Sequence, residues 1–114
     1  MATSDSAPWS IVRVPFPYTD RPVRQHRPAL VIASTGAHAL LWVLMITSAE
    51  NRGWSEDVLI SDHKRAGLPV PSLVRCAKIA TIDAQDAERI GMLPNADRRK
   101  VARIVQRILA PQLA

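Results

Sequence analysis

The hydrophobic residues of this 114-residue chain fall into short runs separated by prolines, glycines and polar residues. The run from Pro28 to Ala33 carries no charge, is rich in Leu, Val and Ile, and ends at the polar residues 34–36. A run of this length and composition predicts a strand whose two faces are both covered. Proline suits the first residue of a strand and holds the preceding residue extended. The pattern therefore places Arg27 in a fixed direction at the start of a buried strand.

Other apolar runs predict further strands. They cover residues 11–14, 40–46, 57–60 and 73–82. Pro15 and Pro17 are expected to end the first of them, because proline lacks the amide hydrogen that a strand interior needs. Trp42 lies inside an apolar run and is expected in the core. Cys76 is expected to be a small buried side chain.

The end of the chain predicts helices. A short helix is expected over residues 83–90, capped by Asp83 and ended by Gly91, and a final helix over residues 95–110, stopped by Pro111. The chain shows no alternation of strands and helices and no internal repeat. The order therefore predicts an α+β fold, in which a small, strongly curved antiparallel sheet carries helices packed on it.

The runs at residues 28–33 and 40–46 are joined by a short polar connection at residues 35–38. Two strands joined this closely are expected to be antiparallel neighbours. Such pairing brings the end of the second strand beside the start of the first. Thr47 and Arg27 are therefore expected to face the same region.

The composition adds a size and a charge to this picture. With 47% hydrophobic residues the chain is expected to form one compact domain, over residues 9–114, after a disordered tail at residues 1–8. The 15 Lys and Arg against 10 Asp and Glu give a net charge of +5, and most of the cations are arginine. This balance suits an anionic partner such as nucleic acid or an acidic protein.

A single cysteine rules out a disulfide within the chain, and no Cys and His residues have the spacing of a zinc site. No metal or cofactor is therefore predicted. The chain has no apolar signal region and no run long enough to span a membrane, which favours a cytoplasmic protein.

A series of short motifs resembles a known family. The first half carries Val14-Pro15-Phe16-Pro17 with Asp20, Arg27-Pro28-Ala29-Leu30-Val31, and Ile46-Thr47-Ser48. The second half carries Gly67-Leu68 with Ser72, Val74-Arg75, Lys78-Ile79, Thr81-Ile82-Asp83, and Ile90-Gly91 with Leu93. In this order and spacing the series resembles the MazF/PemK toxins of type II toxin–antitoxin systems. The match departs from the family at Trp9-Ser10, where members usually carry Gly and an acidic residue.

The resemblance implies an SH3-like barrel of the CcdB/MazF type with helices, and a homodimer. It also implies a ribonuclease that cuts single-stranded RNA without a metal, leaving a 2′,3′-cyclic phosphate and a 5′-hydroxyl, so that the RNA's own 2′-oxygen is the nucleophile. A cognate antitoxin is implied as the partner that occupies the RNA groove.

The resemblance places the family's catalytic arginine on Arg27 and its catalytic threonine on Thr47. A forked, permanent cation suits the nonbridging oxygens of the phosphate, and a hydroxyl can bond the phosphate or orient the nucleophile. The same residues also have plain structural explanations. Arg27 could pair with Asp20, and a threonine at a strand end is often an ordinary strand former.

Further candidates would bind the RNA. Ser48 could donate a hydrogen bond, and the loop aromatics Phe16 and Trp54 could stack on unpaired bases or could fix their own loops. A third polar position of the family falls near Lys78, although Arg75 in the same strand is an open alternative. His26 is a weaker candidate for moving a proton.

Two other functions remain open at this point. The CcdB gyrase poisons share this type of barrel and act by binding a protein without catalysis. A barrel that binds RNA but does not cleave it is the second alternative. Arg27 beside Pro28, together with the triplet at residues 46–48, favours the ribonuclease, because a pure binder has no need of that pair.

Overall fold

The computed structural model describes residues 7–17, 24–36 and 39–113, with the backbone alone at residues 16, 17, 24 and 25. In chain order these ranges contain β1 (Ser10–Pro17), β2 (Arg24–Thr35), β3 (Leu40–Ser48), β4 (Asp57–Leu59), β5 (Ser72–Asp83), β6 (Glu88–Met92) and α1 (Asn95–Leu113). Two short 3-10 turns, η2 (Ala49–Asn51) and η3 (Ala84–Asp86), follow β3 and β5. Most of the predicted tail, residues 1–6, lies outside the described residues.

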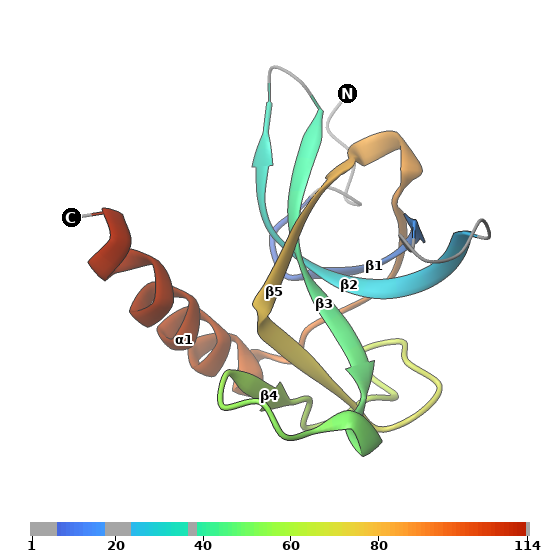
Figure 1. Ribbon diagram of the computed structural model, residues 1–114. Helices are drawn as coiled ribbons and strands as arrows, with labels where there is room; N and C mark the ends of the chain where they lie inside the picture. Colours follow the sequence, from blue (N-terminus) through green and yellow to red (C-terminus); the bar gives the residue numbers. More distant parts are fainter. Residues whose placement is uncertain (1–6, 18–23, 37–38, 114) are drawn as a thin grey trace.

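The strands form one antiparallel sheet in the order β4-β5-β3-β2-β1-β6, and α1 lies against one side of it (Figure 1). β2 and β3 form the predicted hairpin, with pairs running from Ala29–Met45 to Thr35–Leu40. The sheet with its single C-terminal helix confirms the predicted α+β class. No helix in the described part of the chain is both long and apolar enough to cross a membrane.

The sheet curves strongly, but its end strands do not pair with each other. Among the described residues β4 pairs with β5 and β6 pairs with β1, so no backbone ladder closes the predicted barrel. The chain before β5 contacts β6 instead. A Cβ atom added to Gly67 would lie 2.0 Å from the carbonyl oxygen of Ile90, and one added to Gly91 would lie 2.0 Å from that of Ala66. Two glycines thus allow two backbones to touch.

The core consists of two clusters on opposite faces of the strands. The cluster between the sheet and α1 includes Ile11, Leu30, Leu44, Ile46, Val74, Leu93 and Val101. The other cluster consists of Val12, Val14, Ala29, Val31, Leu41 and Val43. Consecutive residues of β1 and β2 alternate between the clusters, as strand geometry requires. The prediction that the run at residues 28–33 is covered on both faces is therefore confirmed.

α1 begins at Asn95, as predicted, but it continues past Pro111 to Leu113. A proline in the last turn removes one backbone hydrogen bond and leaves the rest of the helix intact. The first turn is anchored by Asp97, whose carboxylate accepts hydrogen bonds from the backbone N (2.9 Å) and the hydroxyl (3.0 Å) of Ser61.

Residues 83–90 do not form the predicted helix. Asp83 does cap a turn, because its carboxylate accepts a hydrogen bond from the backbone N of Gln85, but the turn ends at Asp86. Residues 88–92 then form β6, which pairs with residues 10–13 of β1. This long-range pairing outweighs the helical preference of a segment too short to be stable alone.

Pro15 and Pro28 lie inside strands that the sequence predicts them to end and to start, whereas Pro17 is the last residue of β1. Pro15 and Pro17 belong to the part of β1 that pairs with β2 alone, because β6 pairs only with residues 10–13. Pro28 lies in β2 just before its pairing with β3 starts at Ala29. Where a strand is paired on one side only, a residue without an N–H is tolerated.

The prediction that Trp42 belongs to the core is wrong, because its side chain is 45% exposed. Trp42 lies on the same face of β3 as Leu44, whose partner on β5 is Ile79. α1 packs over Leu44 but leaves Trp42 and Ile79 half exposed. Cys76, by contrast, is buried as predicted.

Candidate active site

A cavity of about 390 Å³ lies between β2, β3 and the chain that precedes β5. Its lining residues are Arg13, His26, Arg27, Pro28, Ile46, Thr47, Ser48, Gly67, Leu68, Pro69, Val70, Ser72 and Ile90. Its lining combines apolar side chains with the arginines of β1 and β2 and with hydroxyl groups at the end of β3 and the start of β5. A few polar groups converging on an apolar hollow are typical of a ligand site.

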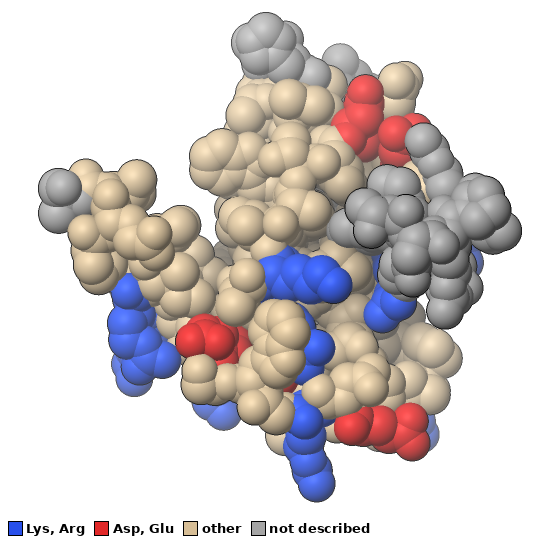
Figure 2. Space-filling view, in the orientation of Figure 1, with Lys and Arg blue, Asp and Glu red and all other residues tan. Residues whose placement is uncertain are grey.

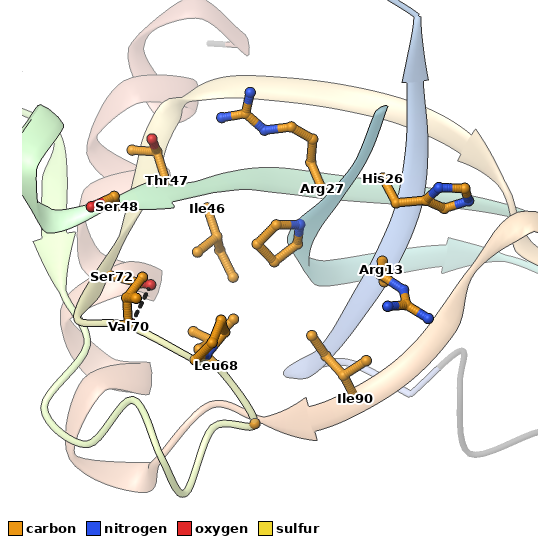
Figure 3. A pocket seen from close by; sticks show the side chains of 13 residues that line it. Arg13, His26, Arg27, Ile46, Thr47, Ser48, Leu68, Val70, Ser72 and Ile90 are labelled. Atoms are coloured by element: carbon orange, nitrogen blue, oxygen red, sulfur yellow. Dashed lines mark hydrogen bonds between the residues drawn. The ribbon is translucent and has the colours of Figure 1, made fainter. Parts of the chain in front are cut away.

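Arg27 and Thr47 both line this cavity, so their predicted proximity is confirmed. The strand register explains it: two residues beyond the Ala29–Met45 pair, β2 reaches Arg27 and β3 reaches Thr47. Figure 3 shows the Arg27 side chain extending toward Thr47. Both residues are partly exposed, so a bound molecule could reach the guanidinium and the hydroxyl together.

The Thr47 hydroxyl has a defined partner. Its oxygen accepts a hydrogen bond of 2.8 Å from the side-chain amide nitrogen of Asn51, the last residue of η2. Ser48 lies beside it on the cavity wall, and its hydroxyl accepts a bond of 3.3 Å from the backbone N of Glu50. The turn that follows β3 thus fixes both hydroxyl groups at the edge of the cavity.

Arg13 also lines the cavity, which the sequence reasoning missed. Its guanidinium forms an ion pair with Glu88 on β6, and both side chains are more than half exposed. A pair this exposed adds little stability. The available signal was a lone arginine in an otherwise apolar strand. His26, the weaker proton-transfer candidate, lines the cavity as well.

The remaining wall, residues 67–72 with Ile90, was also missed. Ser72 is held there by its own hydroxyl, which donates 2.8 Å to the carbonyl of Val70 (Figure 3). The available signal was the motif of Gly67-Leu68 with Ser72. Nothing local shows that the motif faces the cavity, because the wall depends on the contact between Gly67 and β6, which are far apart in the sequence.

Two of the other predicted RNA-binding residues, Lys78 and Trp54, do not line the cavity. Lys78 is exposed in β5 next to an irregularity in the register, where Met45 pairs with Arg75 but Leu44 pairs with Ile79. Trp54 is 49% exposed, and Arg75 lies over its ring. The side chain of Phe16 lies outside the described residues. The roles of all three stay predictions.

Arg75 forms an ion pair with Asp57 and does not line the cavity. Its Nε and Nη2 atoms each lie 3.0 Å from a carboxylate oxygen of Asp57, and its Cζ lies 4.1 Å from the centroid of the Trp54 ring. Burial alone would raise the pKa of Asp57, but the hydrogen bonds and charge of Arg75, with backbone bonds at residues 53 and 54, lower it. The same ion pair raises the pKa of Arg75.

Figure 2 shows most of the Lys and Arg of this face on its lower half, with acidic side chains among them, while the upper part carries acidic side chains toward its right edge and is otherwise uncharged. Among residues 7–17, 24–36 and 39–113, no three His, Cys, Asp or Glu side chains cluster as metal ligands would.

Comparison with known sequences matches residues 7–109 to the family described as the PemK-like, MazF-like toxins of type II toxin–antitoxin systems. The chain belongs to this family. The match covers the cavity residues on β2 and β3 and the motifs of the second half of the chain. A search of curated proteins finds no match.

Solved structures of MazF toxins share the fold. MazF from Deinococcus radiodurans superimposes with a TM-score of 0.71 at 22% identity, covering 90% of this chain and 94% of that one. The Mycobacterium tuberculosis toxin MazF-mt6 gives 0.68 at 23% identity, over 89% and 96%. An endoribonuclease from a mycobacterial species, in complex with its cognate antitoxin, gives 0.67 at 18% identity, over 90% and 93%.

Proposed function

We propose that this MazF-like toxin is an endoribonuclease that cleaves single-stranded RNA without a metal ion. The observation that carries the proposal is the convergence of Arg27 and Thr47 on one cavity. Membership of the family supports it, and so does the fold shared with a mycobacterial protein described as an endoribonuclease.

In the proposed reaction the 2′-oxygen of the RNA attacks the adjacent phosphorus. The bond from phosphorus to the 2′-oxygen forms, the bond to the 5′-oxygen breaks, and the products are a 2′,3′-cyclic phosphate and a 5′-hydroxyl. Arg27 would hold the nonbridging oxygens, on which negative charge accumulates, through its forked N–H groups. Thr47 would donate to the same phosphate. His26 is the lining group suited to accept the proton of the 2′-hydroxyl. The departing 5′-oxygen takes a proton from this histidine or from water and becomes the 5′-hydroxyl.

The proposal extends to partners. We expect a homodimer, a cognate antitoxin as inhibitor, and action in the cytoplasm on messenger RNA. The supporting observation for the antitoxin is that two structural neighbours are complexes of this kind: MazE-MazF from Deinococcus radiodurans and the mycobacterial endoribonuclease with its antitoxin. Ser48, Phe16, Trp54 and Lys78 remain the proposed RNA-binding residues.

The test is cleavage of a single-stranded RNA in EDTA by the wild type, Arg27→Ala and Arg13→Ala. Arg13 is the matched control, because it is an arginine that lines the same cavity and is paired with Glu88. We expect wild-type cleavage in EDTA, a loss on the order of 10² to 10³ in rate for Arg27→Ala, and less than about tenfold for Arg13→Ala. Equal losses, or cleavage that EDTA abolishes, would overturn the proposal.

A second substrate separates the alternatives. An RNA with 2′-deoxyribose at the scissile position should bind and stay intact, because the nucleophile is missing. Cutting of that substrate would refute the proposed attack. Binding without cleavage of ordinary RNA would favour the RNA-binding barrel, and inhibition of DNA gyrase without any RNA cleavage would favour a CcdB-like poison.

A further inference from the structure

Asn51 has no assigned role, yet it makes the hydrogen bond that fixes the Thr47 hydroxyl. Its Nδ2 atom lies 2.8 Å from Thr47 Oγ1, and it comes from the turn η2, four residues along the chain. A hydroxyl offers one proton and accepts through its oxygen. Because the amide supplies a proton to that oxygen, the hydroxyl's own proton must point to another acceptor. The cavity that Thr47 lines is where a bound phosphate would supply one.

Asn51 is itself held by the ion pair behind it. Arg75 Nη2 donates a hydrogen bond of 2.7 Å to the backbone carbonyl of Asn51, while Arg75 also holds both carboxylate oxygens of Asp57. The side chains of Arg75 and Asp57 are 12% and 8% exposed. A bidentate pair this well covered is rigid compared with a surface pair. The turn is also held beside the start of β5, because the backbone N of Ala49 donates a hydrogen bond of 2.9 Å to the carbonyl of Pro71, the residue before β5.

We propose that Asn51 is a positioning residue that makes the Thr47 hydroxyl a hydrogen-bond donor toward the bound phosphate, and that Arg75 holds Asn51 in place. This inference rests on the proposed function. The inference also makes the proposed role of Thr47 more specific, because a hydroxyl held as a donor stabilises charge on the phosphate and does not serve as a base. Asn51 is exposed, so RNA lying over the turn would exclude water and strengthen the contact.

The experiment uses Asn51→Ala, Asn51→Asp and Thr47→Val, alone and combined, in single-turnover cleavage at saturating RNA. Asn51→Ala should lower the rate about tenfold, the worth of one hydrogen bond. Asn51→Asp keeps the shape but replaces the donor with an acceptor that captures the hydroxyl proton, so it should lower the rate about 10²-fold. Gln106→Glu makes the same amide-to-acid change at an exposed position of α1 and should have no effect.

A double-mutant cycle separates positioning from a structural role. In the Thr47→Val background, Asn51→Ala should cause no further loss, because there is no hydroxyl left to orient. Binding of the 2′-deoxy substrate and Tm should match the wild type for Asn51→Ala. Arg75→Lys, which cannot hold Asp57 with two nitrogens and reach Asn51 at once, should give a smaller loss that also disappears with Thr47→Val.

Two outcomes would overturn the inference while the proposed function stands: losses from Asn51→Ala and Thr47→Val that multiply, or an Asn51→Asp variant as active as the wild type. If Thr47→Val itself cleaves at the wild-type rate, the assigned role of Thr47 in the proposed function fails, and the inference fails with it. The single Thr47 variant therefore tells the two failures apart.

Discussion

On one side of the cavity, which we call the steric wall, the chain at residues 66 and 67 lies against β6. On the other side, which we call the polar wall, the turn η2 lies against β5. The first contact is purely steric: Gly67 and Gly91 let two backbones approach to distances at which any side chain would overlap. The second is polar, since Arg75 joins the carbonyl of Asn51 to the carboxylate of Asp57. One wall should therefore be insensitive to pH and intolerant of added atoms, whereas the other should depend on ionisation.

The largest expected effect comes from breaking the steric wall with Gly67→Ala. Gly67 has a φ of +83°, where a side chain is strained, and the new Cβ would lie 2.0 Å from the carbonyl oxygen of Ile90. The conformation alone costs about 1–2 kcal/mol, and the overlap forces the backbones apart. We expect a total loss of about 3 kcal/mol in the free energy of unfolding, measured by urea denaturation, and a large fall in cleavage.

Gly36→Ala is the matched control, because a Cβ at Gly36 would meet nothing within 4 Å. It should change the free energy of unfolding by less than about 0.5 kcal/mol. If the two variants are equally stable, the backbone contact between residues 66–67 and β6 does not hold this wall.

The parts of the cavity also differ in how far the sequence could predict them. The apolar runs of β2 and β3 are long, and a short connection joins them, so local pattern alone places Arg27 near Thr47. The polar turn after β3 carries no periodicity, and nothing local shows that Asn51 would reach back to Thr47 or that Arg75 would hold it. The contacts of Arg75 with Asn51 and Asp57 require β5 to pair with β3 and β4, which only the folded chain reveals.

The same dependence on distant segments explains why some predictions of the fold were wrong. Residues 83–90 carry a genuine capping signal, but pairing with β1 decides their structure. Trp42 lies in an apolar run and yet is half exposed, because no pattern within β3 tells where α1 stops covering the sheet. The local sequence therefore predicted correctly the elements that depend on residues close together in the chain. It predicted wrongly those whose structure depends on contact with a distant segment.

A smaller effect should follow from breaking the polar wall with Asp57→Asn. The lowered pKa of Asp57 means that its ionised form stabilises the fold above the ordinary value of 3.8, and that this contribution is lost as pH falls through the lower pKa of the folded state. At pH 7 the variant should therefore have a Tm lower by about 5 °C. The difference between the two proteins should shrink as pH is lowered below 3.8.

Glu88→Gln tests whether any carboxylate would give this result. Glu88 pairs with Arg13 on the surface, with 65% of its side chain exposed, so its removal should shift Tm by less than about 2 °C at every pH. A pH-independent Tm difference for Asp57→Asn would mean that ionisation of Asp57 does not hold the polar wall.

The smallest expected effect is a chemical readout of the polar wall in the intact protein. Cys76 follows Arg75 in β5, and its backbone N donates 3.2 Å to the carbonyl of Glu56, just before β4. Burial, followed by the nearby charges of Asp57 and Glu56, raises the pKa of its thiol to about 11. At pH 8 only about one thiol in 10³ is then ionised, so iodoacetamide should alkylate the native protein far more slowly than the urea-unfolded chain. Asp57→Asn should speed this labelling severalfold by loosening β4 from β5, while Gly36→Ala should leave it unchanged.

Equal labelling rates in native and unfolded wild-type protein would show that this edge of the sheet opens freely, and that a rigid ion pair does not hold the turn beside the cavity.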